Sequence, residues 1–137
     1  MIIPCEVAVK SVIPALRALV AKELTQKHNL KQNDVASLLG ITQAAVSKYN
    51  RHVRGRVLEI EKIDGVHPII LEIVDLLASK HASRDAIVAK FCLACQIVRE
   101  KRLMCHLCER SDPSINVKLC IVCSSGAGNC FKQTPGG

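Results

Sequence analysis

The sequence predicts an all-α fold, and three features of the chain indicate it. Apolar residues recur at three- and four-residue spacing from Ser11 onward, as on one face of a helix. A second apolar stretch follows Pro68, and its stripe is too broad for a single contact surface. No strand–helix–strand pattern surrounds the cysteine pairs. The 137 residues suffice for a small helical domain and a short appendage.

Local signals place each helix along the chain. Helices are expected at about residues 13–28, 32–39 and 43–50, within residues 69–83, and at about residues 84–98. Pro14 suits a first turn, Gly40 supplies a turn, and Thr42 and Ser83 can cap the helices that follow them. Residues 51–68 read as a loop with at most one short regular segment. The apolar helix after this loop either fills the core or pairs with a partner chain.

Positive charge is concentrated in the first half of the chain. Residues 1–56 carry nine Lys or Arg against three Asp or Glu, a net of +6, whereas the remainder carries a net of +1. This imbalance is typical of a protein that binds a polyanion, although a solvated basic face is the alternative. Charged residues interrupt the apolar N-terminal region, so we expect neither a membrane span nor a secretory signal, and a cytoplasmic location.

The segment KQNDVASLLGITQAAVSKYNR, residues 31–51, has the spacing of a helix-turn-helix. Such a motif needs a small residue where its helices cross, a sterically free turn residue and an apolar residue inside the second helix. Ala36, Gly40 and Val46 meet these needs in that order. The alternative is a plain helical hairpin in which Gly40 only ends a helix.

These residues resemble the Cro/C1-type (XRE-like) helix-turn-helix of transcriptional regulators. The matching positions are Gln32, Ala36, Leu39, Gly40, Ile41, Thr42, Ala45, Val46, Ser47 and Tyr49, and the likeness spans roughly residues 12–77. With PCE at 4–6, IPALRA at 13–18 and the cysteine-rich end, the chain is similar to archaeal regulators that carry a C-terminal cysteine cluster. The resemblance implies a lambda-repressor-like bundle followed by a short metal-binding segment, which we divide into residues 1–82 and 83–137.

The resemblance also implies a set of DNA contacts. Base edges would be faced by Gln43, Ala44, Ser47 and Lys48, beside Thr42 at the start of the same helix, and phosphates would be held by Gln32, Arg51, Arg54 and Arg56. Gln43 can bond adenine in a bidentate way, and Ala44 can meet a thymine methyl group. Double-stranded DNA and a second copy of the chain are the partners implied.

Seven cysteines follow the pattern C-x2-C-x9-C-x2-C-x11-C-x2-C-x6-C from residue 92 to residue 130. A reducing compartment disfavours disulfides, and no surrounding pattern favours a thioredoxin-like site. Metal binding remains, by an iron–sulfur cluster or by structural zinc. The predicted ligands are drawn from Cys92, Cys95, Cys105, Cys108, Cys120 and Cys123. Apolar neighbours of the first pair and a short x9 spacing favour the cluster, for example of the 4Fe–4S type, over Zn²⁺.

The remaining candidates have weaker signals. His106 is a spare ligand, Cys130 a bystander or resolving thiol, and Cys5 by default a small buried apolar residue. No paired carboxylates, phosphate loop or serine nucleophile motif indicates an enzyme, and no small-molecule substrate is evident. We therefore expect a dimeric DNA-binding regulator that senses redox state or iron through its cluster. The alternatives are a regulator with a purely structural zinc site and protein partners and, more remotely, a thiol redox enzyme.

Overall fold

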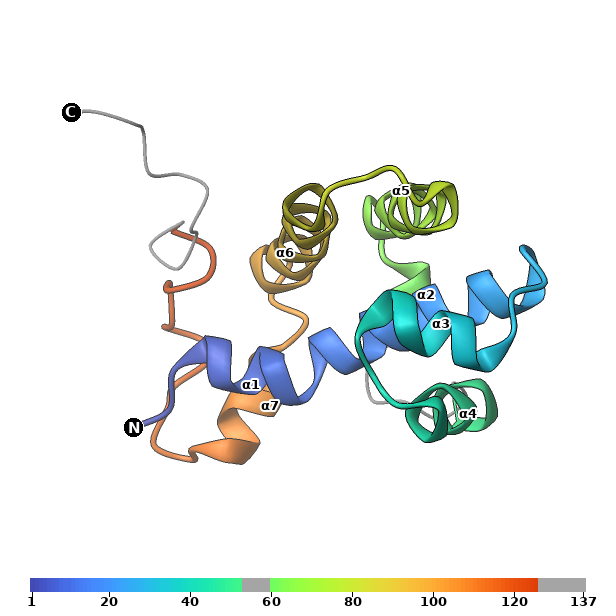
Figure 1. Cartoon of the computed structure of the whole chain (residues 1–137). Coiled ribbons are helices and arrows are strands. Elements are labelled where there is room, and N and C mark those ends of the chain that lie inside the picture. The colour runs from blue at the N-terminus through green and yellow to red at the C-terminus, as the bar shows by residue number, and fades with distance from the viewer. Residues whose placement is uncertain (53–59, 126–137) are drawn as a thin grey trace.

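The computed structural model describes residues 1–52 and 60–125, and every regular element in these ranges is helical (Figure 1). The elements are α1 (Pro4–Lys10), α2 (Val12–Gln26), α3 (Gln32–Leu39), α4 (Gln43–His52), the 3₁₀ helix η1 (Ile60–Lys62), α5 (Val66–Ser79), α6 (Arg84–Glu100) and α7 (Cys105–Ser111). The predicted all-α class is thereby confirmed. None of the helices described combines the length and apolar content needed to cross a bilayer.

The predicted helices lie close to the observed ones. The helix at residues 32–39 coincides with α3, and those predicted at 43–50 and 84–98 each continue two residues further, as α4 and α6. The caps are confirmed, because the Thr42 Oγ1 accepts from the Ala45 N–H at 3.1 Å and the Ser83 Oγ accepts from the Ala86 N–H at 3.2 Å.

Two short helices, α1 and α7, were not predicted. In α1, Pro4 occupies the first turn, and the Glu6 carboxylate accepts a hydrogen bond from the Ile3 N–H at 2.9 Å. A proline followed two residues later by a glutamate is a usable start signal, but seven residues are too few to show helical periodicity. Helix α7 is equally short, and it begins at a cysteine without a side-chain cap.

Helix α2 is the centre of the core. It contacts α1, α3, α4, α5, α6 and η1, and Figure 1 shows it running beneath α5 and beside α3. Its inward residues are almost completely buried, namely Val12, Leu16, Ala18, Val20, Ala21 and Leu24. Because these residues point to several sides of the helix, α2 positions the other elements relative to one another.

Helix α5 fills the core of its own chain, which decides between the two roles expected for its broad apolar stripe. It packs against α2 and α6, and its buried residues are Val66, Ile69, Ile70, Ile73, Val74 and Leu77. The same core continues past residue 82 into Ala94, Val98 and Met104. The cysteine-bearing helix is therefore packed directly on the helical bundle.

The connection between α3 and α4 depends on Gly40. This residue adopts the left-handed conformation, with φ of 66° and ψ of 34°, and its N–H donates to the Ser37 carbonyl at 3.3 Å. A side chain at this φ is strained even though a Cβ would meet no atom within 4 Å. The glycine lets the chain reverse within three residues and start α4 at Gln43.

We expect Gly40→Ala to lower the free energy of unfolding by about 1 kcal/mol, through backbone strain alone. Gly40→Asn is the matched variant and should lose less, because asparagine tolerates the left-handed region. Urea denaturation followed by circular dichroism measures both. Unchanged or higher stability of Gly40→Ala would contradict the conformational role assigned to this residue.

Candidate functional site

Two groups of predicted site residues lie at opposite ends of the molecule. Helices α3 and α4 form one end, whereas α7, the start of α1 and the segment after α7 form the other (Figure 1). Helix α2 extends between these two ends, and α6 lies between them, seen nearly end-on in Figure 1. Of the predicted DNA-contacting residues, those whose side chains are described lie together at α3 and α4, and most of the predicted thiol ligands lie at the other end.

At the first end, α4 packs by one face and leaves the other free. Val46 is fully buried, and Ala36 of α3 is 5 % exposed where the two helices approach α2. Gln43, Ala44 and Lys48 are exposed. This alternation follows from helical periodicity, because residues one turn apart share a face. The predicted base-facing residues therefore lie on the solvent side of α4, with Ser47 half-buried beside them.

A hydrogen bond ties the beginnings of the two helices together. The Gln43 Nε2 donates to the Gln32 Oε1 at 2.8 Å, which joins the first residue of α4 to the first residue of α3. Thr42 caps α4, so its hydroxyl oxygen is already engaged. This bond holds the Gln43 side chain at the edge of α4 in one orientation.

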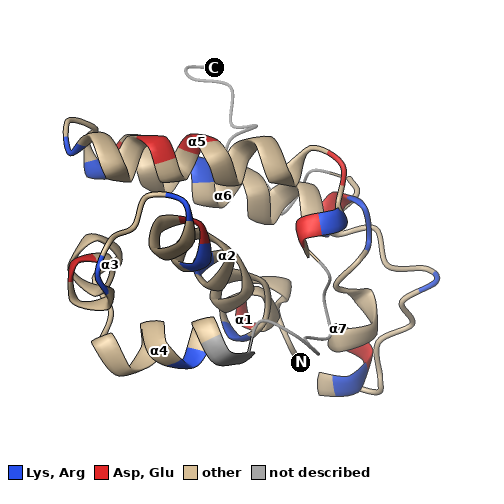
Figure 2. Cartoon of the chain, turned by 90° about the vertical axis from the view of Figure 1, so that its right-hand side faces the viewer, with Lys and Arg blue, Asp and Glu red and all other residues tan. Residues whose placement is uncertain are grey.

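The charge on α4 has one sign. Its sequence contains no acidic residue, and Lys48 supplies a cation on the exposed face (Figure 2). Arg51 belongs to α4, but its side chain lies outside the described residues, as do Arg54 and Arg56 entirely. An exposed helix face that is polar, free of carboxylates and cationic is suited to contact with an anionic surface.

At the second end, four of the six predicted ligand cysteines line one cavity of about 170 Å³. They are Cys105, Cys108, Cys120 and Cys123, which come from α7 and from the segment that follows it. The remaining wall is formed by apolar residues of the chain start and of α7's surroundings and by two arginines, namely Ile2, Pro4, Met104, Ile115, Val117, Val122, Arg99 and Arg102. The two C-x2-C pairs thus face a shared, largely apolar space.

Two arginines near the end of α6 contact the segment that carries Cys120 and Cys123. Arg102 donates from Nη1 to the Cys120 carbonyl at 2.7 Å and from Nη2 to the Val117 carbonyl. The Arg99 Nε lies 3.4 Å from the Cys123 Sγ. The segment around residues 117–123 has no helix of its own, so these charge-assisted hydrogen bonds supply its anchoring.

The thiols of the cavity disfavour one another's ionisation. Burial raises the pKa of Cys108, and the charges of Cys123, Cys105 and Cys120 raise it further. Burial also raises the pKa of Cys105, against the opposing charge of Arg102. A bound cation would relieve this repulsion, so metal binding here would be accompanied by proton release.

The other two predicted ligands lie outside this cavity. Cys92 is exposed on α6 and lines a different cavity. Burial raises the pKa of Cys95 to about 11, while Arg99 opposes this shift and Cys92, Cys5 and Cys123 add to it. Cys95 therefore lies near Cys123 but does not line the cavity that Cys123 lines.

Three further residues complete the comparison with the sequence. The expectation that Cys5 is a buried apolar residue is wrong, because Cys5 is exposed and its Sγ lies 3.6 Å from the Arg99 Nη1. No sequence signal joins positions 5 and 99, since only packing brings them together. His106 is exposed and does not line the cavity, and Cys130 lies outside the described residues.

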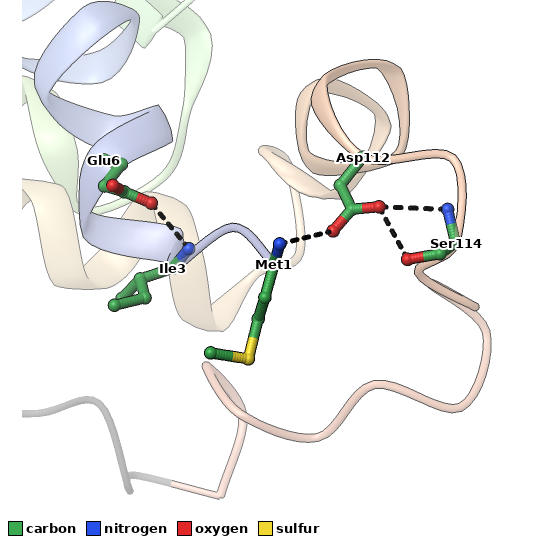
Figure 3. A network of polar contacts seen from close by, with 5 residues as sticks. All are labelled: Met1, Ile3, Glu6, Asp112 and Ser114. Carbon is green, nitrogen blue, oxygen red and sulfur yellow. Dashed lines mark hydrogen bonds and ion pairs between the residues drawn. The ribbon is translucent and has the colours of Figure 1, made fainter.

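The chain start lies beside this site. The Met1 ammonium lies 3.9 Å from the Asp112 Oδ2, and the Asp112 Oδ1 accepts from the Ser114 Oγ at 2.6 Å and from its N–H at 3.1 Å (Figure 3). The Ser114 hydrogen bonds are the main reason that the pKa of Asp112 is lowered. Helix α1 packs on α7 in the same place, and Ile2 and Pro4 line the cavity.

No protein family, curated protein or solved structure matches this chain. Among the described residues, no three His, Cys, Asp or Glu side chains converge closely enough to hold a single metal ion.

We expect Cys95 of the reduced, metal-free protein to react with iodoacetamide far more slowly than Cys92 at pH 7.5. Only the thiolate reacts, and a shift of the pKa from 9.0 to about 11 lowers the thiolate fraction of Cys95 about 100-fold. Cys92, exposed on the same helix, is the internal control. The difference should narrow as the pH approaches 11, which peptide mass spectrometry can follow. Equal rates at pH 7.5 would contradict this assignment.

Proposed function

We propose that the protein is a sequence-specific DNA-binding transcriptional regulator of the Cro/C1 (XRE-like) type that holds an iron–sulfur cluster in its C-terminal cysteines. In this proposal α3 and α4 are the helix-turn-helix of a lambda-repressor-like bundle. The regulator works as a homodimer in the cytoplasm, where two copies of α4 contact two half-sites of one operator.

The arrangement of α4 supports the DNA-binding part of the proposal. The helix buries Val46 and leaves Gln43, Ala44 and Lys48 exposed next to a left-handed glycine turn. A recognition helix has to combine a packed inner face with a polar outer face at its N-terminal end. The Gln32–Gln43 hydrogen bond pre-orders one of the proposed base-reading side chains, which lowers the entropy lost on binding.

Lys48→Ala should weaken binding to the preferred DNA site and make the protein less selective for the sequence of that site. We expect an affinity loss of about tenfold or more at fixed salt, because a lysine that contacts a base edge contributes about 1–3 kcal/mol of discrimination. The preferred site is first selected from a random duplex library with the full chain. Affinity is then measured by fluorescence anisotropy.

Lys101→Ala is the matched control, since it removes the same charge from an exposed position beyond α6. It should alter affinity by less than about threefold and leave the sequence preference unchanged. Failure to enrich any sequence, or equal losses in both variants, would contradict the proposed role of α4.

The cavity lined by Cys105, Cys108, Cys120 and Cys123 supports the cluster. These four thiols share a space whose other lining includes the apolar residues Met104, Ile115 and Val122. Apolar shielding of this kind suits an iron–sulfur cluster, whose potential and oxygen sensitivity depend on solvent exposure.

The chain's own residues would couple this site to the bundle. A bound cluster would supply one-electron redox chemistry and sensitivity to oxygen and iron. Arg99 lies within hydrogen-bonding reach of Cys123, and Arg102 within reach of the Cys120 carbonyl. The charges of these arginines would offset those of the two thiolates. Both arginines belong to the end of α6 or follow it directly, and α6 packs on α2 and α5. A rearrangement of residues 117–123 would therefore act on the core that carries α4.

Protein purified without oxygen should contain stoichiometric iron and sulfide and show broad visible absorbance. We expect Cys120→Ser and Cys123→Ser each to lower the bound iron by more than about half, because each removes one of four ligands. Cys92→Ser is the control and should retain the iron, since Cys92 does not line the cavity. Iron, zinc and sulfide analysis with visible spectroscopy measures all three variants.

A colourless protein with stoichiometric zinc would contradict the cluster and favour the structural alternative. In that alternative, zinc only fastens a segment too small to fold alone, and regulation comes from protein partners. Retention of iron in all the variants would instead contradict the ligand set.

A further inference from the structure

A second and larger cavity lies where α2, α3, α5 and α6 meet. Its volume is about 850 Å³, within the range of small-molecule sites. Helices α2, α3, α5 and α6 each contribute to its wall. Most of the apolar wall comes from half-buried or buried side chains, among them Ile13, Leu38, Leu76, Leu77, Ile87 and Phe91, and Val88 adds an exposed one.

The charged groups of this cavity are all cationic. Arg17 of α2 is half-buried, and Lys80 and Arg84 are exposed at the α5–α6 connection. None of the described residues that line the cavity is acidic. Arg84 is paired only with its neighbour Asp85, at 3.4 Å and with both side chains more than four-fifths exposed, a contact that contributes little. Within the described ranges, Arg17 and Lys80 have no ion-pair partner.

We propose that this cavity is a binding site for a free alkyl carboxylate, such as a medium-chain fatty acid. The apolar walls would take the alkyl chain, whose methylenes leave water on binding. Arg17, Lys80 and Arg84 would hold the carboxylate, since a guanidinium matches its geometry in a bidentate way. Apolar walls and an all-cationic set of charges together define an amphipathic anion.

The cavity borders the turn between α3 and α4, and ligand binding there would be a property additional to the function proposed above. Its wall includes Ser37, Leu39 and Gly40, which end α3 and turn the chain toward α4. A ligand here would touch the element that sets the angle between these two helices. The binding site itself does not depend on whether the chain binds DNA, so it is tested without DNA.

Isothermal titration calorimetry of the full chain with sodium dodecanoate, below its micelle concentration, tests the proposal. We expect saturable binding of one dodecanoate per chain. The triple variant Arg17→Gln, Lys80→Gln, Arg84→Gln should bind at least about tenfold more weakly, from three lost charge contacts. The matched triple variant Lys10→Gln, Lys101→Gln, Lys118→Gln removes the same charge from exposed positions outside the cavity and should bind within about twofold of the wild type.

Three outcomes would overturn the proposal. The first is the absence of saturable binding. If sedimentation then shows a dimer that Leu76→Glu dissociates, a second copy of the chain covers the cavity instead. The second is equal weakening in both triple variants, which would mean that net charge alone attracts the ligand. The third is equal affinity for dodecyltrimethylammonium, which has the same chain and the opposite charge. Circular dichroism confirms that each variant is folded.

Discussion

Burial of α2 on several sides is the constraint on which the rest of the structure depends. Leu16, Val20 and Leu24 are completely buried, and every helix from α1 to α6 packs on α2. A helix of this kind cannot rotate or slide without exposing apolar area that water disfavours. The orientation of α4 at one end and the approach of α6 toward the cysteines at the other both follow from it.

The cysteine end is organised differently, by polar contacts on a small amount of apolar packing. Cys108 and Met104 anchor α7 in the core, whereas the segment after Asp112 is held mainly by Arg99 and Arg102. The Arg102 hydrogen bonds go to backbone carbonyls, whereas the Arg99 contact goes to the Cys123 Sγ and depends on the charge of that sulfur atom. Chemistry at the Cys123 thiol would therefore act directly on a contact that holds this segment, which is the physical argument for the sensing role proposed above.

Helix α6 connects the larger cavity, the cysteine end and the core that supports α3 and α4. The helix lines the larger cavity with Ile87 and Phe91 in its first half, carries Cys95 in its second half, and ends beside Arg102. Its buried Ala94 and Val98 join it to the core that also supports α3 and α4. Events at the thiols or in the cavity would thus meet the same packed elements, and coupling would require only a shift of α6 on α5 and α2.

The sequence by itself determined the helical class, the bounds of α3 and the capped starts of α4 and α6, because helix periodicity, Gly40 and capping hydroxyls act within a few residues of one another. It also indicated the exposed face of α4. Only the tertiary structure decided which thiols share a cavity, that Cys5 approaches Arg99, and that α5 is covered by its own chain. Those outcomes depend on contacts between residues far apart in the chain, for which local spacing carries no signal.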